Sequence, residues 1–272
     1  MYVVKASGEK DKFRPEKLIR SLVRAGASKE LAVQITNEVK QDIWDGITTY
    51  EILELALEKL KERKEKVLML KYDLKRALMK LGPTGYPFER FIAILLNKYG
   101  YRTRNNVVLE GKCVRHEVDV IAEKDGIKYM VECKYHNKRG IKTDLKVAMY
   151  TYARFLDLEK YFNGAWLICN TKCTAETIRY CKCMGVRNTS WAYPPGEWSL
   201  ESMIEKKVLY PVTILSSLNE EARRLALQLN IITVEDFLDK GVEALISAGI
   251  DEKMVLAAQK EGKILLQTKI LG

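Results

Sequence analysis

The sequence predicts an α/β (α+β) protein with three parts: a β-hairpin with helices, a central mixed sheet flanked by helices, and a small helical module. Strand-like and helix-like apolar patterns alternate between residues 88 and 193, which predicts a sheet covered by helices. Glycine and proline punctuate the chain at 82–87 and again at 194–196. Beyond that point the pattern is mostly helical. We therefore expect domains at 1–82, 83–195 and 196–272.

Composition places the protein among ordinary globular proteins. Its 272 residues have room for two or three domains, and a hydrophobic fraction of 47% argues against disorder. No apolar run approaches the length of a membrane span, and charges begin at Lys5, which does not fit a signal peptide. We expect a cytoplasmic protein that has no membrane partner and keeps its six cysteines as thiols.

The net charge of +10 is unevenly distributed. Residues 1–82 carry +5, residues 83–195 carry +8 and residues 196–272 carry −3. Positive charge is thus densest in the central part, which suits a polyanion such as DNA. A merely well-solvated surface would have the same composition, so charge alone leaves both interpretations open.

The first 82 residues predict a hairpin and four helices. Met1 to Ala6 and Lys10 to Phe13 are extended pieces separated by Ser7-Gly8, and Pro15 suits the first turn of a helix. Thr48 or Thr49 can cap the third helix, with Glu51 nearby. The helices are expected to begin at Pro15 and then to run over Lys29 to Trp44, Thr49 to about Arg63 and Lys66 to Leu81.

Lys5 and Lys17, each taken alone, would be ordinary surface lysines. Lys5 lies just before a glycine turn whose backbone amides can approach a ligand closely, and Lys17 opens the first helix. Val3-Val4-Lys5-Ala6-Ser7-Gly8 sits where the ATP-cone family has V-x-K-R-x-G, and Phe13 with Lys17-Leu18 matches its F…K-(I/L). The segment resembles the ATP-cone, the nucleotide-sensing domain of ribonucleotide reductases and their repressor.

The resemblance implies that ATP or dATP binds here as a regulatory ligand. Asp11 would lie near the ribose or base, and Thr49 would match the threonine that opens a family helix. Ala6 and Ser7 replace the usual Arg and Asp, which leaves the preference between ATP and dATP open. The implied nucleotide-binding residues are Val3, Lys5, Gly8, Asp11, Lys17 and Thr49.

The central part reads in the order αβββαβ with a further helix and strand. Phe88 to Tyr99 has a helical apolar stripe that ends at Gly100, and Val107 to Glu110 is the first predicted strand. A hairpin over 115–136 supplies the next two strands, with Lys124-Asp125-Gly126 as its turn. The remaining elements are a helix from about Lys142 to Leu158, a strand Ala165 to Cys169, a helix Thr174 to Met184 and a strand Val186 to Tyr193.

The hairpin carries charge among apolar residues. Asp119 lies mid-strand, where an unpaired charge is costly, and Glu132 and Lys134 are two apart on the next strand and share a face. Carboxylates suit Mg²⁺, which is usually held by one or two of them together with substrate phosphate. A lysine beside such a site can orient a water or offset charge on the phosphate.

Asp119 followed by Glu132-Cys133-Lys134 resembles the D…(D/E)xK signature of the PD-(D/E)XK nucleases, in the variant of the Mrr-like restriction endonucleases. The resemblance implies Mg²⁺ or Mn²⁺ held by Asp119, Glu132 and the carbonyl of Cys133, with Lys134 orienting the attacking water. Glu89 matches an acidic residue that often faces the metal from the first helix. An exposed Glu in the first turn of that helix is the plainer alternative.

Other polar residues near the motif stay open. His136 shares parity with Glu132, whereas His116 has the opposite parity to Asp119 unless the strand bulges. Either could contact phosphate or a water on the metal, or form only a local hydrogen bond. The cysteines lack a paired zinc spacing, so Cys169 and Cys181 are favoured as core residues. A phosphate-contacting rim, or simply a solvated face, is possible at Lys138-Arg139, Lys142 and Lys146.

Residues 196–272 read as helices with a core stripe at Leu215, Leu218, Ala222, Leu225, Ala226 and Leu229, loosely resembling a helix-hairpin-helix module. The whole chain predicts a metal-dependent DNA endonuclease, a homo-oligomer, regulated by ATP or dATP. The alternative is a non-catalytic, nucleotide-sensing DNA-binding regulator. An ATP-hydrolysing enzyme is disfavoured because no G-x-x-x-x-G-K-[ST] loop is present.

Overall fold

The structure, a computed structural model, describes residues 1–267 and consists of two compact units. The first unit comprises Met1–Arg76 together with Lys138–Gly140, and the second comprises the remaining described chain. The last five residues of the predicted helical domain lie outside the described residues. Domain boundaries at residues 82 and 195 stay predictions. None of the helices in residues 1–267 combines the length and apolarity needed to cross a membrane.

The first unit holds a three-stranded sheet packed against helices. Its strand order is β2-β1-β3, and the third strand runs parallel to β1. That strand was not predicted because two residues are too few for a pattern. The helix predicted over 66–81 is two helices, because the chain breaks at Asp73. The elements are β1 (Tyr2–Val4), β2 (Lys10–Lys12), α1 (Pro15–Arg24), α2 (Lys29–Asp42), β3 (Ile47–Thr48), α3 (Thr49–Glu62) and α4 (Lys66–Tyr72). Helix α5 (Leu74–Leu78) begins in the first unit and ends in the second.

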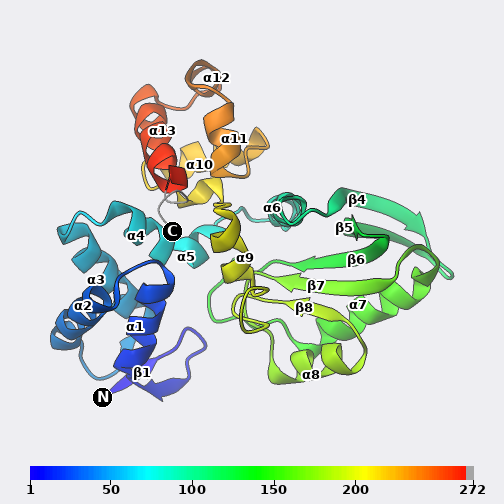
Figure 1. Cartoon of the computed structure of the whole chain (residues 1–272), viewed down its shortest axis with the longest axis horizontal. Coiled ribbons are helices and arrows are strands. Elements are labelled where there is room, and N and C mark those ends of the chain that lie inside the picture. Colours follow the sequence, from blue (N-terminus) through cyan, green and yellow to red (C-terminus); the bar gives the residue numbers. More distant parts are fainter. Residues whose placement is uncertain (268–272) are drawn as a thin grey trace. The chain divides into compact units, whose positions relative to one another are not determined.

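The second unit contains a five-stranded mixed sheet in the order β4-β5-β6-β7-β8. The first three strands are antiparallel and the last three are parallel, which confirms the predicted α/β class. Helices α7 and α8 lie along one face of this sheet (Figure 1), whereas α6 packs against β4, β5 and β6. The elements are α6 (Tyr86–Lys98), β4 (Arg102–Glu110), β5 (Arg115–Lys124), β6 (Ile127–Lys134), α7 (Leu145–Asp157), β7 (Gly164–Cys169), α8 (Ala175–Cys183) and β8 (Arg187–Thr189).

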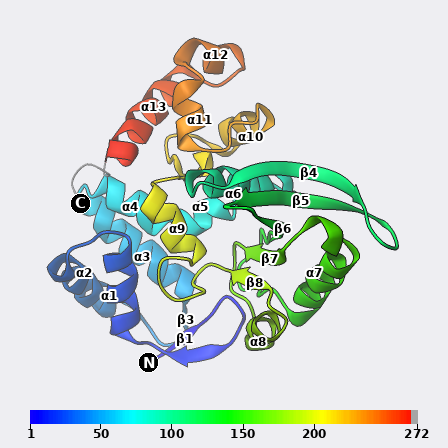
Figure 2. The ribbon, with the colours of Figure 1, turned by 45° about the vertical axis from the view of Figure 1, so that its right-hand side comes forward.

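Three predicted boundaries in this unit were wrong. Strand β4 begins at Arg102, five residues early, because its first half is polar and carries no apolar alternation. Helix α7 begins at Leu145, since the Asp144 side chain caps it by accepting from the Val147 N–H at 3.4 Å. Strand β8 is only three residues long. Figure 2 shows β4 and β5 running side by side as a long ribbon, which the extra residues of β4 make possible.

Strand β5 is irregular at Asp119. Val118 and Ile121 both belong to the apolar cluster under α7 and α8, although residues three apart on a regular strand face opposite sides. On the neighbouring strand Asn106 takes a positive φ of 51° at the same level. The pairing of β5 with β6 also stops here, at Val120 opposite Val131. The two strands therefore separate where Asp119 and Glu132 lie.

The C-terminal helices are part of the second unit. The Thr213 hydroxyl donates to the Ala77 carbonyl at 2.7 Å, and Lys98 pairs with Glu235 at 2.7 Å. Most of the predicted stripe is buried or half-buried, but Leu229 is 38% exposed because α10 ends just before it. The helices are α9 (Leu200–Lys207), α10 (Glu220–Gln228), α11 (Val234–Asp239), α12 (Val242–Ser247) and α13 (Glu252–Gln267).

Candidate active site

Asp119 lies where β5 separates from β6, and its side chain accepts a backbone hydrogen bond from β6 in place of a strand partner. Its Oδ2 atom accepts the Cys133 backbone N–H at 2.7 Å. Because the N–H and C=O of one strand residue point to the same side, the Cys133 carbonyl also faces β5. Burial and the neighbouring charge of Glu132 raise the pKa of Asp119 to about 7. The site therefore holds crowded negative charge that a cation would relieve.

Glu132 is held by a partner that the sequence analysis missed. Arg154, on α7, donates from Nη1 to the Glu132 carboxylate and from Nη2 to the Glu117 carbonyl, so its guanidinium bridges the gap between β5 and β6. Both side chains are largely buried. Burial raises the pKa of Glu132, and the charge of Arg154 opposes that rise. A signal was available, because Arg154 continues the helical stripe of Ala148 and Thr151, where a buried cation needs a partner.

Glu89 reaches this region from the first turn of α6. Its carboxylate accepts from Asn106 Nδ2 at 2.9 Å, and its charge contributes to raising the pKa of Asp119. The same amide donates to Glu117 at 3.1 Å. The positive φ of Asn106 thus turns a strand residue into a link between two acidic side chains. Asn106 was not predicted, since a lone Asn in a polar stretch carries no pattern.

Lys134 follows Glu132 on the same face of β6, whereas His136 comes two residues after the strand ends. The charge of Lys134, two residues further along β6, lowers the pKa of Glu132. The His136 ring lies 3.1 Å from the Thr143 hydroxyl, and the His136 backbone N–H donates to the Asn170 side chain at 2.9 Å. Burial, helped by the charge of Lys134, lowers the pKa of His136. His136 therefore braces the end of β6.

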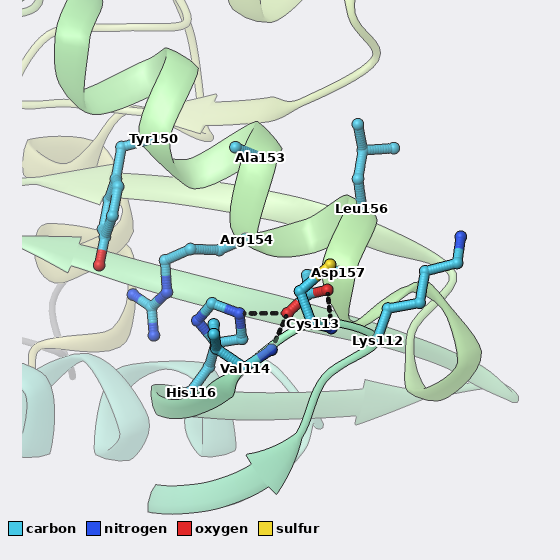
Figure 3. A pocket seen from close by; sticks show the side chains of 9 residues that line it. All are labelled: Lys112, Cys113, Val114, His116, Tyr150, Ala153, Arg154, Leu156 and Asp157. Atoms are coloured by element: carbon cyan, nitrogen blue, oxygen red, sulfur yellow. Dashed lines mark hydrogen bonds and ion pairs between the residues drawn. The ribbon is translucent and has the colours of Figure 1, made fainter.

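His116 faces α7 and pairs with Asp157 at 2.7 Å (Figure 3). Asp157 also accepts the N–H groups of Cys113 at 2.7 Å and Val114 at 3.2 Å, so it fixes the β4–β5 turn. These residues and Arg154 line a hollow of about 420 Å³ between the turn and α7. Of the two interpretations of His116, the structure thus agrees with a histidine that forms a hydrogen bond within the protein.

The donor set fits a hard divalent cation. Asp119 uses one carboxylate oxygen for a backbone N–H and keeps the other, while the Cys133 carbonyl faces the same gap. Within residues 1–267 no three His, Cys, Asp or Glu side chains gather as a ready metal cluster. A cation at this gap would therefore also need oxygen ligands from water or substrate.

The chain matches three families in sequence order. They are described as "ATP cone domain" over residues 1–80, "Restriction endonuclease" over 82–183 and "AF1548-like, C-terminal" over 210–266. An "Uncharacterized protein" of Archaeoglobus fulgidus is 41% identical over 182 residues, which make up 66% of this chain and all of that protein. The chain belongs to the AF1548-like family.

A solved structure titled "Crystal Structure of Protein of Unknown Function AF1548" is also similar to this AF1548-like protein. It is 38% identical, has a TM-score of 0.59, and its match covers 68% of this chain and 100% of that chain. The family matches confirm the ATP cone and the restriction-endonuclease domain that the two motifs predicted. The AF1548-like protein is thus nuclease-like and carries a nucleotide-sensing domain.

The residues implied in nucleotide binding lie on the first unit. Lys5 and Lys17 converge on Asp11, with Nζ atoms 3.5 and 3.0 Å from its Oδ2. The hydrogen bond from Lys17 does most to lower the pKa of Asp11 to about 2. Gly8 closes the turn at a φ of 81°. Val3 is buried in the core, while Thr49 opens α3 behind the capping residue Thr48 and is exposed.

The two cysteines predicted in the core are buried, whereas the residues of the candidate basic rim are exposed. Cys169 and Cys181 are buried in the cluster under α7 and α8, as favoured, and Cys169 lies 3.4 Å from Cys173 between sulfur atoms. Cys183 is exposed. The candidate rim residues are all exposed, and of these Lys138 and Arg139 belong to the first unit.

Proposed function

We propose that this AF1548-like protein is a metal-dependent DNA endonuclease that hydrolyses phosphodiester bonds and is regulated by ATP or dATP bound to its ATP cone. The proposal rests on two buried carboxylates, Asp119 of β5 and Glu132 of β6, at the point where these strands stop pairing, with Lys134 two residues after Glu132. Two desolvated carboxylates beside a backbone carbonyl are costly unless a cation joins them. The restriction-endonuclease family match supports the same chemistry.

Each residue has a distinct role in this proposal. Asp119, Glu132 and the Cys133 carbonyl hold Mg²⁺ or Mn²⁺, which when bound stabilises charge on the scissile phosphate and lowers the pKa of its water. Lys134 orients the attacking water from the same strand face as Glu132. Glu89, tied to Asn106, adds negative charge from α6 that favours cation binding. When the nucleotide binds, Lys5 and Lys17 leave their ion pairs with Asp11 and pair with the nucleotide phosphates.

One observation favours a second candidate, a nucleotide-sensing DNA-binding regulator without catalysis. Arg154 already neutralises Glu132, and a cation must share or replace that partner to use the carboxylate. If the Arg154–Glu132 pair never opens, the sheet would serve only to bind DNA. The intact Asp119, Glu132 and Lys134 set argues for the nuclease, because binding alone does not require it.

Cleavage of supercoiled, linear and branched DNA separates the two candidates. The reactions contain Mg²⁺ or Mn²⁺, with and without ATP or dATP, and compare wild type with Glu132→Ala and Lys134→Ala. We expect each substitution to reduce cleavage at least about 100-fold. Glu110→Ala removes an exposed carboxylate of the neighbouring strand β4 and should cleave normally. Equal cleavage by wild type and Glu132→Ala would reject the nuclease and favour the regulator.

A further inference from the structure

A basic cavity lies in the second unit beside the C-terminal helices. It measures about 720 Å³ and is lined by the chain between Lys80 and Pro87, by Asn137 after β6, and by α10. Its charged lining consists of the cations Lys80, Arg223 and Arg224 and the single carboxylate Glu220. The excess of cations in one concave site favours an anionic ligand.

The two arginines stand out within their module. Residues 196–272 carry a net charge of −3, and Arg223 and Arg224 are its only arginines. Both line the cavity. Arg223 Nη2 donates to the Leu215 carbonyl at 3.0 Å, which orients its guanidinium. Because a guanidinium presents several donors in one plane, it is the side chain best suited to phosphate oxygens.

The cavity is close to the proposed catalytic residues along the chain. Asn137 follows Lys134 by three residues, a separation of at most about 10 Å. The cavity therefore lies near the end of β6 at which Glu132 and Lys134 are placed. The Thr213–Ala77 hydrogen bond ties the C-terminal module to the start of this unit. A volume of about 720 Å³ exceeds that of one phosphate and admits a nucleotide unit with its neighbouring phosphate.

We propose that this cavity binds the sugar–phosphate backbone of the nucleic-acid strand that occupies the active site. The AF1548-like C-terminal module would then contribute phosphate contacts to the nuclease domain. The inference rests on the proposed function, because it assumes a nucleic-acid substrate at the end of β6. It assigns the binding role to Arg223, Arg224 and Lys80, none of which belongs to the catalytic set.

The test is DNA binding measured by fluorescence anisotropy in EDTA, where metal-dependent cleavage cannot occur. Labelled duplex and single-stranded oligonucleotides are titrated over a salt series with wild type, Arg224→Ala, Arg224→Lys and Lys253→Ala. Arg224 is exposed, so its replacement should fold normally. Lys253 is an exposed cation of the same module outside the cavity, which makes Lys253→Ala the matched control.

We expect Arg224→Ala to weaken DNA binding about tenfold. The slope of log affinity against log salt should become shallower by about 0.9 for a duplex contact or about 0.7 for a single strand. Arg224→Lys should keep most of that slope, and Lys253→Ala should resemble wild type. Equal affinities and slopes for Arg224→Ala and Lys253→Ala would overturn the inference. ATP binding that depends on Arg224, together with unchanged DNA binding, would also overturn the inference.

Failure of the inference can be told apart from failure of the proposed function. If DNA binding depends on Arg224 but no cleavage depends on Glu132, the nuclease proposal is rejected and the DNA-binding role of the cavity is retained. If cleavage depends on Glu132 but DNA binding does not depend on Arg224, the nuclease proposal is retained and the DNA-binding role of the cavity is rejected.

Discussion

Asp119 and Glu132 meet the cost of burial in different ways. Asp119 accepts one backbone N–H and lies near other carboxylates, so its ionised form is disfavoured and its pKa rises to about 7. Glu132 has a full counter-charge in Arg154. Neutralising Asp119 removes an unfavourable buried negative charge. Neutralising Glu132 instead leaves the buried guanidinium of Arg154 without its anion. The two carboxylates should therefore respond oppositely to the same kind of substitution.

We expect Asp119→Asn to stabilise the metal-free protein at pH 8 and Glu132→Gln to destabilise it. The folded pKa of Asp119 lies above its unfolded value of 3.8, so this group's contribution to stability falls as pH rises from about 4 to about 7. Asparagine keeps an acceptor for the Cys133 N–H. A gain of about 1 kcal/mol would raise the melting temperature by roughly 2–4 °C. Losing the carboxylate partner of Arg154 should cost about 3 kcal/mol.

Thermal melts in EDTA at pH 8 and pH 5 measure both effects. The advantage of Asp119→Asn should shrink at pH 5, where Asp119 of the wild type is already protonated. Glu110→Gln, at an exposed carboxylate of β4, should match wild type. Shifts of the same sign for the two buried carboxylates would contradict this description of the site.

At the scale of elements, Asp157 joins the end of α7 to the β4–β5 turn. Hydrogen bonds from His116, Val114 and Cys113 hold the pKa of Asp157 below its usual range. The same helix carries Arg154 one turn earlier. A loosened turn would therefore also loosen the cation that spans β5 and β6.

We expect Asp157→Asn to lower the melting temperature at pH 7. A carboxyl whose folded pKa is depressed stabilises the fold above its unfolded pKa and loses that contribution as pH falls through the folded value. The deficit should thus be constant from pH 8 to about 5 and narrow below about pH 4. Melting curves across this range check the prediction, with Asp144→Asn as a control at the other end of α7. A deficit that grows in acid would contradict it.

In the first unit, one carboxylate gathers both lysines that the ATP-cone resemblance implies. Asp11 holds Lys5 and Lys17 within 3.5 and 3.0 Å. Since both cations lie at the β1–β2 hairpin and the start of α1, a triphosphate could be met by them together. We expect Lys17→Ala to weaken ATP binding about tenfold, as measured by calorimetry. Lys29→Ala, at the exposed start of α2, should bind like wild type.

At the scale of the whole molecule, a short segment after β6 is part of the first unit. Arg139 lies 4.0 Å from the centre of the Tyr50 ring, and Gly140 has a φ of 80° with its Cα facing the Ala6 carbonyl. The segment begins four residues after Lys134, and Ala6 lies in the turn that contains Gly8. Nucleotide binding at this turn therefore has a short covalent route to the proposed catalytic strand.

We expect Gly140→Ala to reduce the effect of ATP or dATP on DNA cleavage. A Cβ at this position would collide with the Ala6 carbonyl and would also strain the positive φ. Gly126→Ala is the matched control, because Gly126 has a φ of 77° and open space where its Cβ would lie. Ratios of cleavage rates with and without nucleotide measure the response. An equal response in both variants would exclude this route of coupling.

Local patterns in the sequence predicted much of this architecture. Asp125-Gly126 supplied the positive-φ turn of the β5–β6 hairpin, and apolar periodicity located α6, α7, α8 and β7. The spacing of Glu132 and Lys134 placed both on one strand face. These features depend on neighbours in the chain, so the sequence alone determines them.

Only the tertiary structure decided which residues meet across elements. The Arg154–Glu132 and His116–Asp157 pairs join a strand to a helix about 20 to 40 residues away, and the Asn106–Glu89 pair joins β4 to α6. The cavity at Arg223 and Asn137 needs the C-terminal helices folded against the sheet unit. No local preference encodes such contacts, because they follow from the packing of whole elements and from the need of buried charges for partners. The sequence determined the family, the order of elements and the motif; the fold determined the partners that tune its charges.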